Sequence, residues 1–371
     1  MTQQRLIVST CGTSALTNIA GEERTLVTKY ANARTAEDIP ETVRKRLQSV
    51  IDAMQRRLTA AKPDELSNLS AELNGLLWLN MGQLDASRDN HWLIATDTWL
   101  GKSTADAISK VLERYDQIVE VKPISDLRTD SLDEFHIAMT DLASLCAEEV
   151  RGWREGGWKI IFNLTGGFKS VQGFMQTLGM LYADETVYVF ERTNELLCIP
   201  RLPIRMDIED VLRGNEEALR AFQRMAIELP VTEDETRGLP GTLLIKIDGE
   251  VALSVWGKIV WDNSKYKLLG KSLLPPITTN LRYAPGFEKT VKQYQQETDR
   301  MYKINERLMD LARHLEDKQY NPKRLDFKQL KGKHDPWTHE CDAWADKDAR
   351  RIFGHFEGDT FVVDDLQKGL H

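Results

Sequence analysis

Residues 159–170 read KIIFNLTGGFKS, and this stretch decides how the first half of the chain folds. Its apolar start, IIF, is typical of a short strand buried on both faces of a parallel sheet. Gly166 and Gly167 lack a Cβ, so the backbone can turn sharply there and a ligand can approach closely. Residues 168–182 then place apolar side chains at helical spacing. The stretch therefore predicts a strand, a glycine turn and a helix.

The same turn brings together groups that bind anions. Backbone N–H groups at a helix N-terminus attract phosphate, and Thr165, Lys169 and Ser170 add two hydroxyls and a cation beside them. We therefore expect an anion site at this turn. The alternative is a plain strand-to-helix turn whose polar side chains only cap the helix.

Two other predicted strands end in hydroxyl-rich loops. Residues 6–8 lead into STCGTSALTN (9–18), and residues 92–95 lead into TDTWLGKST (96–104). Open α/β sheets bind ligands at the carboxyl ends of their strands, so the loops could line one polar pocket. The spacing is not that of a GxGxxG dinucleotide fingerprint. Taken singly, each loop could instead only cap a helix.

The remainder of the first 200 residues alternates between strands and helices. Further strands are predicted at 118–121, 186–190 and 196–199, and helices at 35–62, 67–84, 105–115 and 132–151. This succession is that of a doubly wound α/β sheet.

Composition indicates a soluble cytoplasmic protein. Of its 371 residues, 41% are apolar and 29% charged, and no apolar run approaches the roughly 18 residues of a membrane span. The N-terminus, MTQQRLIVST, lacks the apolar core of a signal peptide. The four cysteines show no CxxC spacing, so neither a disulfide framework nor a zinc site is expected. The length predicts two or three domains.

Charge is distributed unevenly along the chain. The net charge of −8 disfavours a protein that coats nucleic acid with its whole surface. From residue 277 to the end, however, 17 Lys and Arg balance 17 Asp and Glu, and residues 318–333 hold six basic side chains against one acid. This basic run is either a docking surface for an RNA backbone or a generic solvated face.

The strings STCGTSALTN, ATDTWLGKST and FNLTGGFKSVQGFMQTLGMLYADETVYVFE resemble the CARF domain, the CRISPR-associated Rossmann fold that senses cyclic oligoadenylates. The resemblance covers residues 1–204. It implies a homodimer with an activating cyclic tetra-adenylate across its two-fold axis, and no cofactor or metal. The implied ligand-binding residues are Thr10, Gly12, Thr13, Ser14, Thr96, Asp97, Thr98, Thr165, Gly166, Gly167, Phe168, Lys169 and Ser170. Ser14 and Lys169 would align a ribose 2′-OH if the domain slowly cut its ligand.

Residues 205–275 form a second predicted domain in which the alternation stops. A helical pattern spans 208–229, and residues 243–260 predict a β-hairpin turning at Asp248-Gly249, followed by further strand. A helix with a wing-like hairpin is compatible with a winged helix. It could serve as a structural connector or read DNA, and its acidic first half disfavours DNA.

Residues 276–371 form a third, small α+β domain. A strand is predicted at 278–283, one or two helices within 287–319, a basic strand or loop in RLDFKQLKGK (324–333), and two strands in ARRIFGHFEGDTFVVDDL (349–366).

This order, with LKG at 330–332 and RRIF at 350–353, resembles the RelE-type messenger RNA interferases, which cut mRNA in the ribosomal A site. The resemblance implies a metal-independent endoribonuclease whose partners are the ribosome and mRNA. Attack of a 2′-OH on the adjacent phosphate needs a base, cations for the phosphorane and an acid for the leaving oxygen. The candidates are Lys331, Lys333, Arg350 and Arg351 for the phosphate, and His355, Lys368 and His371 for proton transfer. The Tyr common near the end of that family is missing, so the general base stays open.

Together these patterns predict a type III CRISPR ancillary effector, in which cyclic oligoadenylate bound to a CARF dimer activates a ribosome-dependent ribonuclease. One alternative is a ligand-gated winged-helix transcription regulator. Another is a ring nuclease that only degrades the cyclic ligand.

Overall fold

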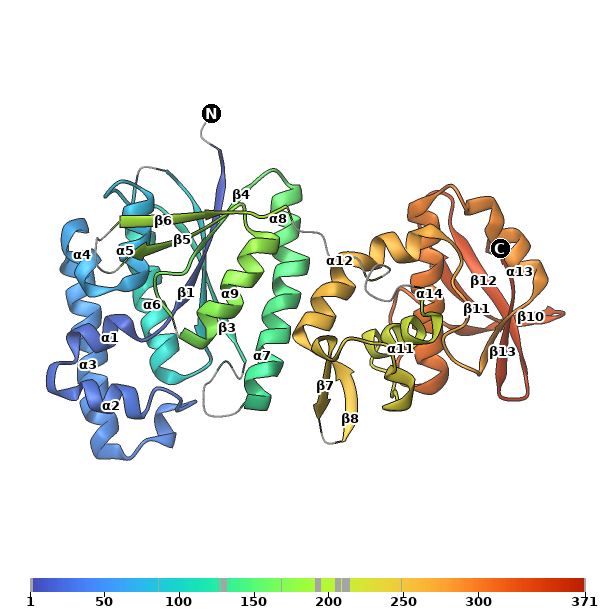
Figure 1. The fold of residues 1–371 in the computed structure, drawn as a ribbon, viewed down its shortest axis with the longest axis horizontal. Helices are drawn as coiled ribbons and strands as arrows, with labels where there is room; N and C mark the ends of the chain where they lie inside the picture. Colours follow the sequence, from blue (N-terminus) through green and yellow to red (C-terminus); the bar gives the residue numbers. More distant parts are fainter. Residues whose placement is uncertain are drawn as a thin grey trace. The chain divides into compact units, whose positions relative to one another are not determined.

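Two units make up the chain, Met1–Ile204 and Arg205–His371, and each has its own sheet and hydrophobic core (Figure 1). The computed structural model describes residues 3–85, 87–125, 127, 132–167, 169–190, 195–203, 208, 214–247 and 249–369.

A six-stranded sheet forms the centre of the first unit. Its strands are β1 (Arg5–Cys11), β2 (Asn90–Thr96), β3 (Ile118–Ile124), β4 (Lys159–Asn163), β5 (Glu185–Phe190) and β6 (Glu195–Pro200). They lie in the order β3-β2-β1-β4-β5-β6, parallel except for β6, which runs antiparallel to β5. The predicted largely parallel α/β sheet is confirmed.

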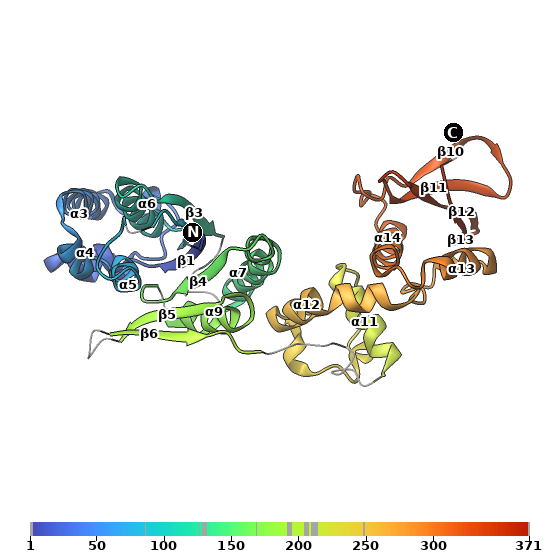
Figure 2. The same cartoon turned by 90° about the horizontal axis from the view of Figure 1, so that it is seen from above.

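Helices cover both faces of this sheet. They are α1 (Ser14–Ile19), α2 (Arg24–Lys29), α3 (Glu41–Ala60), α4 (Pro63–Leu69), α5 (Ala71–Leu79), α6 (Trp99–Arg114), α7 (Leu132–Leu145), α8 (Arg151–Glu155) and α9 (Lys169–Tyr182). Figure 2 shows α3, α5 and α6 on one face, where Ile7 and Ile161 join the core, and α7 and α9 on the other. Successive strand residues point to opposite faces, so Leu6 and Phe162, both fully buried, lie on the face that α7 and α9 cover.

The region predicted as one helix at 67–84 is two helices, α4 and α5. Ser70 stands between them in extended backbone and caps α5, because its Oγ accepts a hydrogen bond from Leu73 N at 3.3 Å. The apolar pattern continues across the break and hides it. α5 is also apolar around most of its circumference, which makes it a buried helix rather than an amphipathic one.

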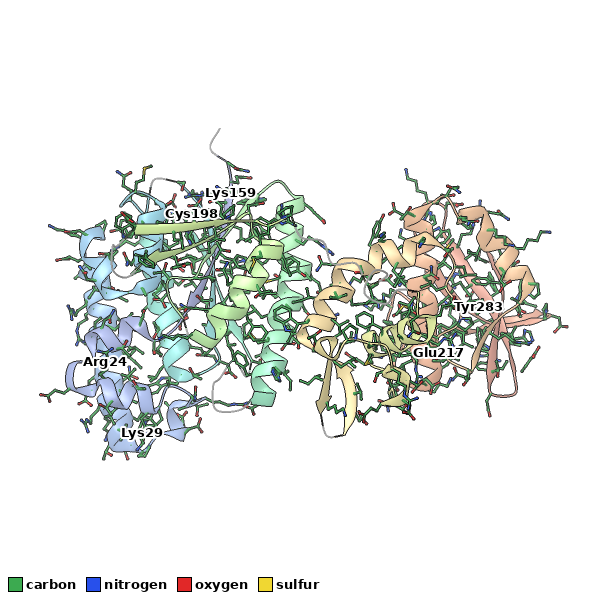
Figure 3. All side chains as sticks on the ribbon, viewed as in Figure 1. Arg24, Lys29, Lys159, Cys198, Glu217 and Tyr283 are labelled. Atoms are coloured by element: carbon green, nitrogen blue, oxygen red, sulfur yellow. The ribbon has the colours of Figure 1, made fainter. Side chains whose placement is uncertain are left out.

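The strand order creates a topological switch point. From β1 the chain moves outward through β2 to β3, then returns to the other side of β1 and continues through β4 to β5. The loops that follow β1 and β4 therefore leave in opposite directions, and the gap between them is where doubly wound sheets bind ligands. Lys159, labelled in Figure 3, marks the opposite, amino-terminal end of β4.

The second unit begins with helices and a hairpin. Its first described elements are α11 (Glu216–Ala226), β7 (Leu244–Ile247), β8 (Glu250–Leu253) and α12 (Val255–Lys271). The predicted hairpin is present, but the strand expected to follow it is helix α12. The β-branched residues in VWGKIV favour a strand locally. This local preference does not decide the structure, because Ser254 caps the helix by accepting a hydrogen bond from Gly257 N at 3.2 Å and because Ile259 and Trp261 are buried in the core.

A five-stranded sheet closes the second unit. Its elements are β9 (Leu281–Tyr283), α13 (Pro285–Val291), α14 (Thr298–Glu316), β10 (Lys328–His334), β11 (Trp337–Trp344), β12 (Arg350–Glu357) and β13 (Thr360–Gln367). The order is β10-β11-β12-β13-β9, antiparallel except where β9 runs parallel to β13. Strand β11 was not predicted. Tyr283 of β9, labelled in Figure 3, packs against Phe287 with ring centroids 5.4 Å apart.

One hydrophobic core runs through the second unit. Phe222 and Trp261 of the helix-and-hairpin region share it with Phe287 and Ile352 of the last 95 residues. The division of the chain into domains at 1–204, 205–275 and 276–371 stays a prediction. Among the described residues, no helix is long and apolar enough to cross a bilayer.

Candidate functional site

The loops after β1 and β4 touch each other closely through glycine. A Cβ on Gly12 would lie 3.1 Å from the Cα of Gly167, and one on Gly167 would lie 2.8 Å from the Cβ of Thr10. Gly167 also has a φ of +100°, which other residues rarely adopt. The glycine turn read from the sequence thus serves to bring two strand ends into contact.

Side chains of β1 and β4 bind these loops together. The Thr10 hydroxyl is buried and donates to the carbonyl oxygen of Gly166 at 2.5 Å. Asn163 donates from Nδ2 to Ser9 Oγ at 3.2 Å and to the carbonyl oxygen of Glu72 at 3.0 Å. The strand ends are therefore linked to each other and to α5.

Glu72 of α5 lies at the centre of this arrangement, fully buried. Its Oε1 accepts from Gly12 N at 3.0 Å, and its Oε2 accepts from the hydroxyls of Ser14 at 2.6 Å and Ser70 at 2.7 Å. A Cβ on Gly166 would lie only 2.3 Å from Glu72 Oε1. The carboxylate of Glu72 thus accepts hydrogen bonds from donors that face the switch point.

Sequence reasoning missed Glu72. Its one signal is local: it is the only charged residue of α5, whose sequence is AELNGLLWL. A glutamate in the first turn of a helix is usually explained by the helix dipole. That explanation does not predict that Glu72 also contacts Gly12, 60 residues before it in sequence, and lies against Gly166, 94 residues after it.

Cys11, next to this cluster, is not poised for nucleophilic chemistry. Burial raises the pKa of its thiol well above the ordinary value, and the charges of Glu72 and Asp106 raise it further. A thiol in such surroundings stays protonated and inert.

A cleft of about 630 Å³ opens on the α9 side of the glycine turn. Thr165 and Lys169, both predicted ligand contacts, line it together with Tyr188 and Phe190 of β5. Neither the Lys169 ammonium nor the Tyr188 hydroxyl has a hydrogen-bond or ion-pair partner within the described ranges. Gln172 steadies the turn, because its Nε2 donates to the carbonyl oxygens of Leu164 at 3.0 Å and Gly166 at 3.2 Å.

The other predicted contacts in this unit are placed differently. Thr96 and Thr98 are buried with their hydroxyl oxygens 2.8 Å apart, and Thr98 caps α6 by accepting from Gly101 N at 3.2 Å. Asp97 is half-buried, and its Oδ1 has no partner within the described residues. Thr13 is half-buried, and its side chain does not cap α1. Phe168 and the side chain of Ser170 lie outside the described residues.

In the second unit, the two predicted arginines lie on opposite faces of β12. Arg350 donates from Nε to Tyr294 Oη at 3.2 Å and pairs with Asp348 at 2.7 Å. Arg351 pairs with Glu340 and, at 3.3 Å, with Asp342 of β11. Because neighbouring strand residues alternate, the two guanidinium groups do not converge on one phosphate.

His355 shares a face of β12 with Arg351, four residues away. Its Nδ1 is 2.6 Å from Asp364 Oδ2 and its Nε2 is 3.3 Å from Glu357 Oε1. The hydrogen bond with Asp364 is the main reason that the pKa of His355 lies above its ordinary value. This histidine is therefore biased toward the protonated form.

The remaining candidates of this unit form no single cluster. Lys331 is exposed on β10, and Lys368 is exposed with its Nζ 3.9 Å from Asp348 Oδ1. The side chain of Lys333 and the whole of His371 fall outside the described residues. Arg324, in the predicted basic run, is tied to Asp310 by two hydrogen bonds of 2.8 Å. The described residues contain no group of three His, Cys, Asp or Glu side chains suited to a metal ion.

Residues 67–202 match the family described as CRISPR-associated protein (Cas_APE2256), a family of CARF domains. The match includes Glu72, the glycine turn and the cleft, and it leaves out β1 and the second unit. No curated protein matches the chain.

Proposed function

We propose that the chain is a type III CRISPR ancillary effector: a dimer whose first unit binds a cyclic oligoadenylate and whose second unit then cleaves mRNA on the ribosome. The observation that carries this proposal is the glycine turn after β4. It lies at the switch point of the sheet, within the residues that match the CARF family, beside an open cleft and a lysine that is unpaired among the described residues.

The chemistry of the ligand fits this position. A cyclic oligoadenylate carries one phosphate and one flat base in each nucleotide. Lys169 at the start of the 14-residue helix α9 offers a cation where the helix dipole also favours negative charge. One chain offers too few donors for four phosphates, so two copies of the site supply the rest. A homodimer is therefore favoured.

Support for a ribonuclease comes from the second unit. It has the predicted series of one strand, two helices and a mainly antiparallel sheet. On one face of β12 stand a guanidinium, Arg351, and an imidazole whose pKa is raised, His355. The guanidinium suits the charge of a phosphorane, and the protonated imidazole suits the general acid that protonates the leaving 5′ oxygen. The base stays open between Lys368 and His371.

The ion pairs of Arg351 provide a mechanism by which ligand binding would control RNA cleavage. Glu340 and Asp342 hold this guanidinium, so an RNA phosphate must compete with two carboxylates for it. A ligand activates only if it binds more tightly to the state in which Arg351 is released. In the absence of ligand we therefore expect slow cleavage.

The test is to mix purified protein, ribosomes and mRNA with and without cyclic tetra-adenylate and to map the cut RNA. We expect ligand-dependent cuts that disappear in Arg351→Ala while ligand affinity stays intact. Arg237→Ala is the matched control, since that arginine is exposed and its one ion pair within the described ranges is with Asp234, three residues away. No cleavage under any condition would reject the ribonuclease proposal.

A second candidate is a ligand-gated transcription regulator. It is favoured by the hairpin β7–β8 between helices α11 and α12, an order compatible with a winged helix. Ligand-dependent binding to a DNA operator without RNA cleavage would support this alternative. Loss of the cyclic ligand with neither effect would instead support a ring nuclease.

A further inference from the structure

The two ring nitrogens of His355 have unequal surroundings. Nδ1 lies 2.6 Å from Oδ2 of Asp364, whose side chain is only 13% exposed. Nε2 lies 3.3 Å from Oε1 of Glu357, whose side chain is 55% exposed and also pairs with Arg282 of β9. One nitrogen is therefore held by an enclosed carboxylate, and the other faces a surface group that an RNA chain can displace.

A β-bulge places Asp364 against His355. The pairing of β12 with β13 shifts register between Phe353 and Gly354, which leaves Asp364 without a partner of its own on β12. A Cβ on Gly354 would lie 2.3 Å from the carbonyl oxygen of Val362, so the close approach of the strands here requires glycine. Bulges are frequent next to active sites, where they re-aim a side chain. Here the extra residue is the one whose carboxylate meets the imidazole.

The imidazole of His355 is surrounded by charges of one sign. Within the described residues, the charged groups in contact with it are Asp364 of β13 and Glu357 at the end of β12. From β9, Arg282 reaches Glu357, and on β11 the register places the uncharged Thr338 opposite His355. The hydrogen bond with Asp364 is the first of the causes that raise the pKa of His355. The imidazole therefore keeps its second proton to a higher pH than an ordinary histidine does.

The contact with Asp364 also decides which nitrogen can exchange a proton. An ionised carboxylate only accepts hydrogen bonds, so it holds a proton on Nδ1 of His355. Nε2 is then the nitrogen that gives or takes a proton, and the other ring nitrogen fixes the orientation of the ring. Arg351, on the same face of β12, supplies the cation for a phosphate near this nitrogen.

We propose that Asp364 is a positioning residue for RNA cleavage, which holds the His355 imidazole so that Nε2–H points at the leaving 5′ oxygen. This inference rests on the proposed ribonuclease activity. The 2′ oxygen forms a bond to phosphorus while its proton passes to the general base. The bond between phosphorus and the 5′ oxygen breaks, and that oxygen takes the bonding electron pair and the Nε2 proton. The products are a 2′,3′-cyclic phosphate and a 5′-hydroxyl, and Asp364 stays ionised throughout.

The experiment measures the rate of mRNA cleavage against pH, with full-length protein, ribosomes and cyclic tetra-adenylate. A general acid loses activity as the pH rises through its pKa. In Asp364→Asn we expect this fall to begin at lower pH than in wild type, and cleavage near pH 8 to be at least about tenfold slower. Asp365→Asn is the matched control, because the Asp365 carboxylate accepts from Thr290 Oγ1 at 2.8 Å. Its rate and pH profile should match wild type.

His355→Gln is a second, independent variant, because glutamine can still donate to Asp364 but does not titrate. We expect cleavage at least about a hundredfold slower, without the fall at alkaline pH. Thermal melting shows which variants are folded, and His355→Gln decides alone if Asp364→Asn is not. An unchanged pH profile in folded Asp364→Asn, or wild-type cleavage by His355→Gln, would overturn the inference. A folded wild-type protein that cuts no mRNA would instead overturn the proposed ribonuclease, and the role of Asp364 with it.

Discussion

Replacing Glu72 with alanine tests whether this carboxylate holds the switch point together. The substitution removes the acceptor for Gly12 N, Ser14 Oγ and Ser70 Oγ in a place without solvent. The two hydroxyls can rotate toward other acceptors. The Gly12 amide cannot, because its position is set by the close contact with Gly167.

The expected loss of stability follows from these contacts. An unpaired buried amide costs about 1–3 kcal/mol, and the lost methylene burial adds about 0.8 kcal/mol. Hydrogen bonds to a charged acceptor contribute about 1.5–3 kcal/mol each, which is partly offset because a carboxylate no longer has to be buried. We expect a net loss of about 3 kcal/mol. In a domain of roughly 200 residues this corresponds to a fall in Tm of about 6–12 °C.

Differential scanning calorimetry measures this effect, because it can resolve the first unit's transition from that of the second. Glu155→Ala is the matched control. Glu155 is 73% exposed and forms a long ion pair of 3.7 Å with Arg151, and such surface pairs contribute little to the free energy of unfolding. A first-unit transition in Glu72→Ala within about 2 °C of wild type would refute the reasoning, since one unpaired amide alone should exceed it.

Three further predictions concern pH and the glycine turn. Burial lowers the pKa of His91 to about 4. As the pH falls below about 6.5, the unfolded chain therefore binds a proton that the folded chain does not, and the free energy of unfolding should drop by about 3 kcal/mol by pH 4. Urea titrations should show a smaller drop in His91→Gln. The hydrogen bond with Asp364 raises the pKa of His355. The protonated imidazole therefore stabilises the fold fully below the ordinary histidine pKa, and this stabilisation is lost as the pH rises through the raised pKa. In Asp364→Asn, NMR titration should find the pKa of His355 lowered, and an unchanged pKa would contradict the assigned cause. Gly167→Ala should destabilise the first unit by at least about 1 kcal/mol, because its φ is +100° and its Cβ would meet Thr10; calorimetry showing an unchanged transition would contradict this.

The sheet and its glycine turn could be predicted from sequence because their signals are local. A short apolar run, two glycines and a helical repeat follow one another within 159–182, and the structure has β4, the turn and α9 at those positions. Glu72 could not be found this way. Its partners become neighbours only when α5 packs against the ends of β1 and β4, and no spacing in the sequence records that.

The errors in the second unit also have physical causes. Residues 255–260 have strand propensity, but a serine cap and burial in the core make them helical. Strand β11 was missed because its sequence, WTHECDAW, mixes charged with apolar residues and lacks Val and Ile. Its buried acid Glu340 is explained only by strand pairing, which brings Arg351 and Lys328 of the two neighbouring strands to it. Composition indicated the basic candidates of this unit, but the carboxylates that hold many of them depend on strand pairing.

The central claim is that cyclic oligoadenylate binds where β1 and β4 end, and a crystal structure of the full-length protein grown with cyclic tetra-adenylate tests it most directly. The account predicts one ring for every two chains, with a phosphate at Lys169 beside the Gly166–Gly167 turn. A ring bound elsewhere on the protein, or crystals from a saturating solution with the switch point unoccupied, would contradict it.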